Sequence, residues 1–71
     1  MKPVIYREVR RKLHAAGFVE VGRTGSHVKF AKTTSGGTFT ATVPKHREVA
    51  AGTLRSILRQ AHLSPEEFER L

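Results

Sequence analysis

His27 is the residue of this chain whose type and setting best suit chemistry. It follows a turn that contains Gly25, and it opens a segment in which Val28 and Phe30 alternate with polar residues. Because side chains alternate across a strand, we expect His27 to point away from the core that holds Val28 and Phe30. An imidazole with an ordinary pKa of about 6.5 takes up and releases protons near neutral pH. His27 is therefore a candidate general base.

Two cations accompany His27 in the sequence. Lys29 is expected to share its face of the strand, and Arg23 lies just across the turn. An exposed imidazole among cations suits RNA cleavage by internal attack, because a base must remove the 2′-hydroxyl proton and positive charge must stabilise the phosphorane. The alternative is a surface histidine that only contacts phosphate. The residues alone leave both interpretations open.

A second basic segment, formed by Lys45, His46 and Arg47, follows Pro44 and leads toward a predicted helix. Backbone N–H groups at a helix start bind phosphate readily, so this segment is a candidate phosphate-docking loop. His46 could have a secondary catalytic role there, or it could be a solvated loop histidine.

The four histidines show no spacing that is typical of a metal site. His14 and His62 fall at the ends of predicted helices, where a cation complements the helix dipole, so we interpret both as structural. The chain has no cysteine, which excludes disulfides and thiolate zinc ligands within it and fits a reducing compartment. We expect neither a metal ion nor a cofactor.

Hydrophobic periodicity predicts the helices that must hold these residues in place. An apolar stripe of Ile5, Val9 and Leu13 predicts a first helix over residues 3–16. A second helix is expected to begin at a Gly52-Thr53 N-cap, with an apolar stripe made of Leu54, Ile57, Leu58 and Ala61. Ser64 to Phe68 has the pattern of a capping box with proline at the first helical position, which predicts a short C-terminal helix.

Three segments between the long helices alternate apolar and polar residues, which predicts half-buried strands. Val19 and Val21 mark the buried side of the first, and the turn at 24–26 and the glycine-rich loop at 34–37 predict an antiparallel meander. The expected fold is therefore α+β with the order α-β-β-β-α, with helices on one face of the sheet. The other face is open, and it presents threonines rather than the aromatic platform of a single-strand reader, namely Thr38, Thr40 and Thr42.

The net charge of the chain indicates which kinds of molecule it would bind. The chain has 71 residues, and 13 lysines and arginines against 6 glutamates give a net charge of +7. Such a charge attracts nucleic acid, an anionic membrane face or an acidic protein. We expect one domain over residues 1–71, no signal peptide, and no membrane span, because no apolar run approaches the roughly 20 residues that a span needs.

Three motifs in order resemble the HicA-type toxins of toxin–antitoxin pairs: Arg-Thr-Gly-Ser-His-x-x-Phe (23–30), Val-Pro-x-His (43–46) and Gly-Thr-Leu-Arg-Ser-Ile-Leu-Arg-Gln-Ala (52–61). The resemblance implies a fold like the double-stranded-RNA-binding domain and metal-independent cleavage of mRNA in the cytoplasm. It also implies a HicB-type antitoxin that masks the toxin, and so a hetero-oligomer of the two.

The resemblance also implies roles for particular residues. The histidine of its Gly-Ser-His motif is catalytic, and this role falls on His27, with Gly25 and Ser26 as the turn that positions it. His46 matches a second recurrent histidine. Two departures are Val28, where many members have another histidine, and Arg47, where many have glycine.

Two other classes of protein are alternatives to a ribonuclease. A non-catalytic RNA-binding module would have the same fold and basic face, with His27 as a mere contact. A DNA-binding regulator of the helix-turn-helix type would be mostly helical, and the three predicted strands count against it.

Overall fold

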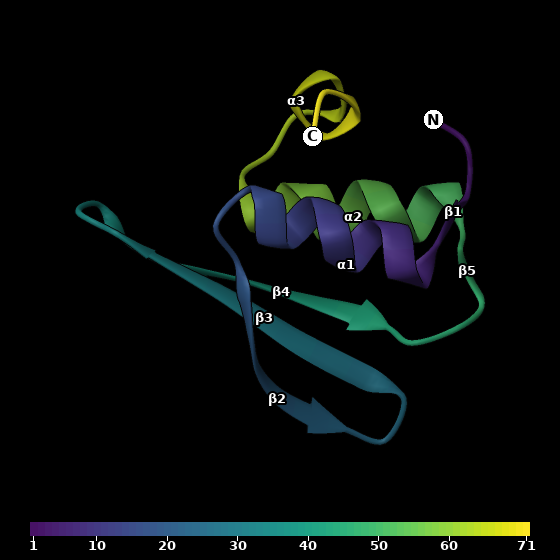
Figure 1. The fold of residues 1–71 in the computed structure, drawn as a ribbon, viewed down its shortest axis with the longest axis horizontal. Helices are drawn as coiled ribbons and strands as arrows, with labels where there is room; N and C mark the ends of the chain where they lie inside the picture. Colours follow the sequence, from purple (N-terminus) through teal and green to yellow (C-terminus); the bar gives the residue numbers. More distant parts are fainter.

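The computed structural model describes residues 1–71 and places the two long helices on one side of a three-stranded sheet (Figure 1). Along the chain the elements are β1 (Val4–Ile5), α1 (Tyr6–Ala15), β2 (Val19–Thr24), β3 (His27–Thr34), β4 (Gly37–Pro44), β5 (Glu48–Val49), α2 (Ala51–Ala61) and α3 (Pro65–Glu69). The predicted α+β class and the order α-β-β-β-α are confirmed, and the fold is like the double-stranded-RNA-binding domain. No helix has both the length and the apolar character to cross a membrane.

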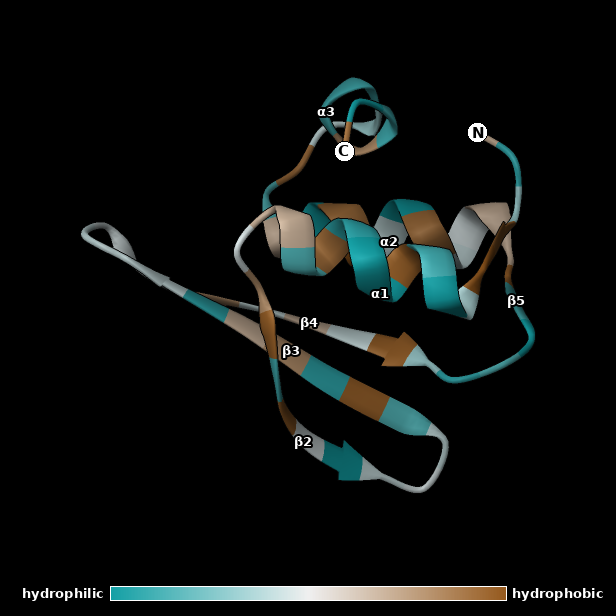
Figure 2. Ribbon diagram, in the orientation of Figure 1, coloured by the Kyte–Doolittle hydropathy of each residue, from teal (hydrophilic) through white to brown (hydrophobic).

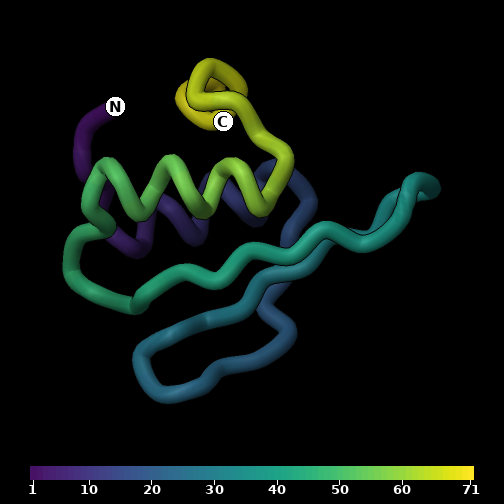
Figure 3. The backbone as a smooth tube through the Cα atoms, turned by 180° about the vertical axis from the view of Figure 1, so that it is seen from behind, coloured from purple at the N-terminus to yellow at the C-terminus, as the bar shows by residue number.

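The three long strands form an antiparallel sheet in the order β2-β3-β4, as the two predicted turns indicate. The β2–β3 turn has only Gly25 and Ser26 between the paired residues Thr24 and His27. Gly25 has a φ of 59° and Ser26 has no positive φ, which is the pattern of a type II′ hairpin turn. At the other end, the β3–β4 hairpin extends well past the helices, as both views show (Figures 1 and 3).

The core lies between the sheet and the helices. Alternate residues of β3, seen as the change of colour along it in Figure 2, turn Val28 and Phe30 inward. They are fully buried with Val9 and Leu13 of α1, and all 13 buried residues are apolar. The buried residues of α2 are the predicted stripe, Leu54, Ile57, Leu58 and Ala61. Helical cover on one face leaves the opposite face of the sheet open.

The first helix begins later than predicted. Val4 and Ile5 are extended and pair with Val49 and Glu48, so β1 and β5 form a small second sheet that the sequence did not indicate. Helix α1 therefore starts at Tyr6, whose backbone N–H donates to the Arg47 carbonyl at 3.2 Å. Ile5, predicted on the buried stripe, is 44% exposed.

The predicted orientation of Val19 and Val21 is wrong, because these side chains are 57% and 55% exposed. Strand β2 is at an edge of the sheet, and Val19 pairs with Ala31 on the open face. The register shifts between Glu20 and Gly22, which leaves Val21 at a bulge. Glu20, opposite Phe30, instead accepts a hydrogen bond from Arg10 at 3.0 Å.

The last two helices differ in how well their starts were predicted. Helix α2 begins at Ala51 with Ala50 as N-cap and no side-chain cap, so the expected Gly52-Thr53 cap is wrong. Helix α3 has the predicted capping box: the Ser64 hydroxyl accepts from the Glu67 N–H at 3.0 Å, and the Ser64 N–H donates to the Glu67 carboxylate at 2.9 Å.

Candidate nucleic-acid interface

His27 is the first residue of β3 and stands on the open face of the sheet. Its neighbours across the sheet are Thr24 on β2 and Pro44 on β4, so its backbone lies between two paired strands. The side chain is exposed, while the next residue, Val28, is fully buried on the helix side. A rigid backbone with a free imidazole is the arrangement that a general base needs.

Lys29 shares the open face with His27, as alternation along β3 predicts. Lys29 is paired with Thr42, and Ala31 with Thr40, so the surface beside His27 consists of small and polar side chains. Facing residues of an antiparallel pair are close neighbours on one face. A single cation, Lys29, therefore stands on the sheet face that carries the histidine.

Arg23 lies across the turn from His27, as the sequence indicates, but its side chain is on the other face of the sheet. The two-residue turn pairs Arg23 with Val28, and paired residues project to the same side, which here is the helix side. The signal was present in the sequence, because a two-residue turn at Gly25 and Ser26 fixes this register. Arg23 and His27 thus flank the edge of the sheet from opposite faces.

The second basic segment lies beside the turn that precedes His27. The Lys45 backbone N–H donates to the Ser26 carbonyl, so residues nineteen apart in the sequence meet at one end of the sheet (Figure 1). His46 and Arg47 follow and are exposed. This segment does not lead directly into a helix, because β5 and Ala50 come before α2. The N–H groups at the start of α2 therefore do not belong to this loop, and phosphate docking here would depend on the side chains of the loop.

A depression on the helix side of this end of the sheet brings further cations together. It has a volume of about 370 Å³ and is lined by Tyr6, Arg7, Arg10, Glu20, Arg23 and Lys45. Arg7 and Arg10 lie off the apolar stripe of the first helix, but nothing in the sequence indicates that α1 and β2 meet there. The interface thus has two basic parts, one on each side of the sheet edge.

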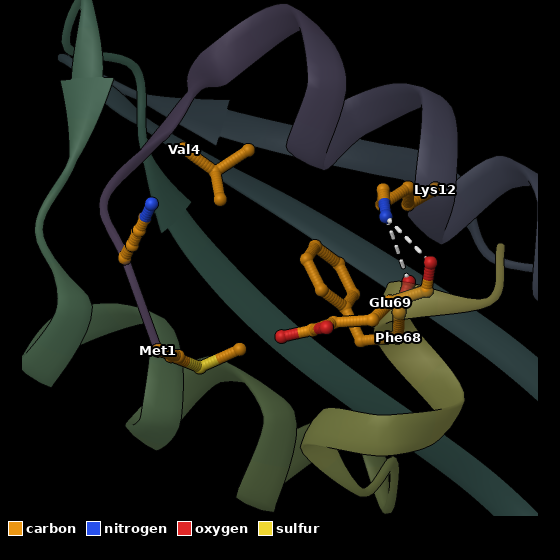
Figure 4. A pocket seen from close by; sticks show the side chains of 6 residues that line it. Met1, Val4, Lys12, Phe68 and Glu69 are labelled. Atoms are coloured by element: carbon orange, nitrogen blue, oxygen red, sulfur yellow. Dashed lines mark hydrogen bonds between the residues drawn. The ribbon is translucent and has the colours of Figure 1, made fainter.

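The largest cavity, about 680 Å³, is elsewhere, between the N-terminal segment, α1 and α3 (Figure 4). Its main polar contact is Lys12, whose Nζ donates to the carbonyls of Phe68 and Glu69 at 3.0 and 3.3 Å. The ammonium also lies 4.9 Å from the centre of the Phe68 ring. Lys12 therefore caps the last carbonyls of α3 and joins that helix to α1.

The remaining histidines have packing contacts. His62 ends α2 with a φ of 58° and stacks on Phe39 at a centroid distance of 4.2 Å. His14 lies edge-on to Phe30 with centroids 6.1 Å apart. No group of three or more histidine, aspartate or glutamate residues is close enough to hold a metal ion.

The fold and the site define a class: a small basic domain of the double-stranded-RNA-binding type, with an exposed histidine among cations at one end of its sheet. A family model described as HicA toxin of bacterial toxin–antitoxin matches residues 6–63. The chain belongs to the HicA toxin family, so it is a toxin of a toxin–antitoxin system and has an antitoxin as its partner. A search of curated proteins gives no match.

Proposed function

We propose that this toxin is an endoribonuclease that cleaves mRNA without a metal ion, with His27 as the general base. The observation that carries the proposal is the exposed imidazole at the start of β3, held between paired strands and next to the basic segment that begins at Lys45. Membership of the HicA family supports the toxin role.

The proposed reaction is an internal transfer. The His27 imidazole accepts the proton of a ribose 2′-hydroxyl, and the resulting oxygen attacks the adjacent phosphorus. The bond from phosphorus to the 5′-oxygen breaks, and that oxygen takes a proton, which the imidazolium can return. The products are a 2′,3′-cyclic phosphate and a 5′-hydroxyl. Positive charge from Lys29, Lys45 and Arg47 stabilises the phosphorane.

The turn before His27 has a positioning role in this proposal. Gly25 provides the positive φ that a two-residue hairpin requires, and Ser26 is fixed through its carbonyl to Lys45. We assign His46 to phosphate docking, since it is exposed in the same loop.

RNA binding through phosphates makes affinity depend on salt. Single-stranded nucleic acid gives a slope of about −0.7 in log affinity against log salt for each phosphate contact. With Arg23, Lys29, Lys45 and Arg47 each making one contact, the slope is about −2.8, and affinity falls about 50-fold between 50 and 200 mM salt.

The antitoxin is proposed to be of the HicB type and to mask this surface in the cytoplasm. An acidic patch would meet the positive charge around His27 and speed association. Val19 and Val21, exposed on β2 beside the open face, add apolar contact area that a partner would cover.

The test is incubation of the purified protein with single-stranded RNA in the presence of EDTA. We expect cleavage with cyclic phosphate and 5′-hydroxyl ends, and no cleavage of the same sequence made with 2′-O-methyl riboses. RNA that is bound in a gel but stays intact would favour a non-catalytic RNA-binding module. Cleavage of the 2′-O-methyl strand would contradict internal attack.

A further inference from the structure

The depression between α1 and β2 has an excess of positive charge. Four of its six lining residues are cations, and Glu20 is the single carboxylate. Glu20 forms an ion pair with Arg10 at 3.0 Å. Arg7, Arg23 and Lys45 have no carboxylate partner, so three like charges surround one concave surface. An anion that enters the depression would relieve their mutual repulsion.

The Tyr6 hydroxyl adds a hydrogen-bond donor at the same place. It is buried and has no hydrogen-bond partner, which is unusual because buried polar groups are nearly always paired. Burial raises the pKa of Tyr6, and Glu20 raises it further, while Arg10 and Arg23 oppose this. The hydroxyl therefore stays protonated near neutral pH and has a proton to donate. The Lys45 ammonium lies 6.0 Å from the centre of the Tyr6 ring.

We propose that this depression is a phosphate subsite, which holds an RNA phosphodiester next to the one that His27 cleaves. Arginine side chains match the paired oxygens of a phosphate, and the Tyr6 hydroxyl supplies a further donor. The proposal rests on the proposed function, because it takes RNA as the ligand.

Continuity with the His27 turn favours RNA over an isolated anion. Lys45 lines the depression, and its backbone N–H is bonded to Ser26, the residue before His27. Arg23 lines it too, on the strand that pairs with the start of β3. A strand of RNA that passes over this edge of the sheet would place one phosphate at His27 and a neighbouring one in the depression.

The test compares two double variants that remove the same charge. Arg7→Gln with Arg23→Gln changes the subsite, and Arg55→Gln with Arg59→Gln changes exposed cations of α2 outside it. On an oligoribonucleotide, we expect the subsite variant to raise KM at least tenfold more than the control, with little change in kcat. Its salt slope should be weaker by about 0.7, the value for the one phosphate that the subsite holds. Tyr6→Phe, which keeps the ring, should raise KM severalfold.

Substrate length gives a second readout. A dinucleoside monophosphate has one phosphodiester and cannot fill both positions, so the wild type and the subsite variant should cleave it equally. Equal KM values for the two double variants on long RNA would overturn the subsite. So would a subsite variant that binds the antitoxin more weakly but binds and cleaves RNA as the wild type does. If the wild type cleaves no RNA, the proposed function fails, while binding of RNA by the two variants still tests the subsite.

Discussion

Replacing Gly25 with alanine tests the turn that positions His27. Gly25 has a φ of 59°, whereas a Cβ added there would meet no atom within 4 Å. The added methyl group therefore meets no neighbour, and any loss in the free energy of unfolding comes from the backbone conformation alone. An L-residue in the left-handed region costs about 1–2 kcal/mol. Alanine also restricts the unfolded chain, which offsets about 0.4–1 kcal/mol of that cost.

The net expected loss is about 1 kcal/mol. For a domain of this size, that loss lowers the midpoint of thermal unfolding by about 4–8 °C. At a temperature well below the midpoint, where the variant is still folded, the rate of RNA cleavage should fall by more than the small loss of folded protein accounts for. Relaxation of the turn displaces His27, and a shift of about 1 Å can reduce a rate about 100-fold.

Gly36, in the other hairpin turn, is the matched control. Its φ lies outside the left-handed region, and an added Cβ would be 3.7 Å from the Thr34 hydroxyl, an ordinary contact. Gly36→Ala should keep or slightly raise stability and leave cleavage unchanged. The assay is thermal unfolding followed by circular dichroism, with cleavage measured on the same samples. Equal midpoints for the two variants would refute the argument from backbone strain.

Further predictions concern the two C-terminal helices. Gly52→Ala, in α2 with no atom within 4 Å of the added Cβ, should stabilise the protein by about 0.5 kcal/mol in urea unfolding, and a loss would contradict this. Ser64→Ala removes the hydroxyl that accepts from the Glu67 N–H and should cost about 1 kcal/mol, while the hydrogen bond from the backbone N–H of residue 64 to the Glu67 carboxylate remains. Hydrogen bonds from Ser64 lower the pKa of Glu67, so their stabilisation is complete above the ordinary carboxyl pKa and is lost as the pH falls through the lowered one. The difference in stability between wild type and Glu67→Ala should therefore shrink in acid, and a constant difference would contradict the role of Glu67.

Periodicity predicted the elements that bury a continuous face. The α2 stripe and the inward side of β3, with Val28 and Phe30, both depend on spacing alone, which the sequence displays. The α3 start was equally predictable, since Ser64 and Glu67 form a local motif.

Features that depend on contacts between distant segments were not predictable. Pairing of Val4 with Val49 involves two-residue strands that have no local signature. Alternation shows that Val19 and Val21 share a face, but which face the helices cover is decided elsewhere in the chain.

The candidate site was predicted in part. The outward side chain of His27 follows from alternation, and its role remains a proposal. The meeting of Tyr6 with Arg23 depends on how α1 packs beside β2, which no motif encodes.

Replacement of the proposed base is the most direct test of the account. The measurement is the rate of RNA cleavage by wild type, His27→Ala and His14→Ala, each shown to be folded by circular dichroism. His14 is an exposed histidine on α1 outside the proposed site, so it controls for loss of an imidazole. We expect His27→Ala to lose about 10²–10⁴-fold in rate, the contribution of a positioned base, while His14→Ala stays near the wild type. Wild-type cleavage by folded His27→Ala would contradict the central claim.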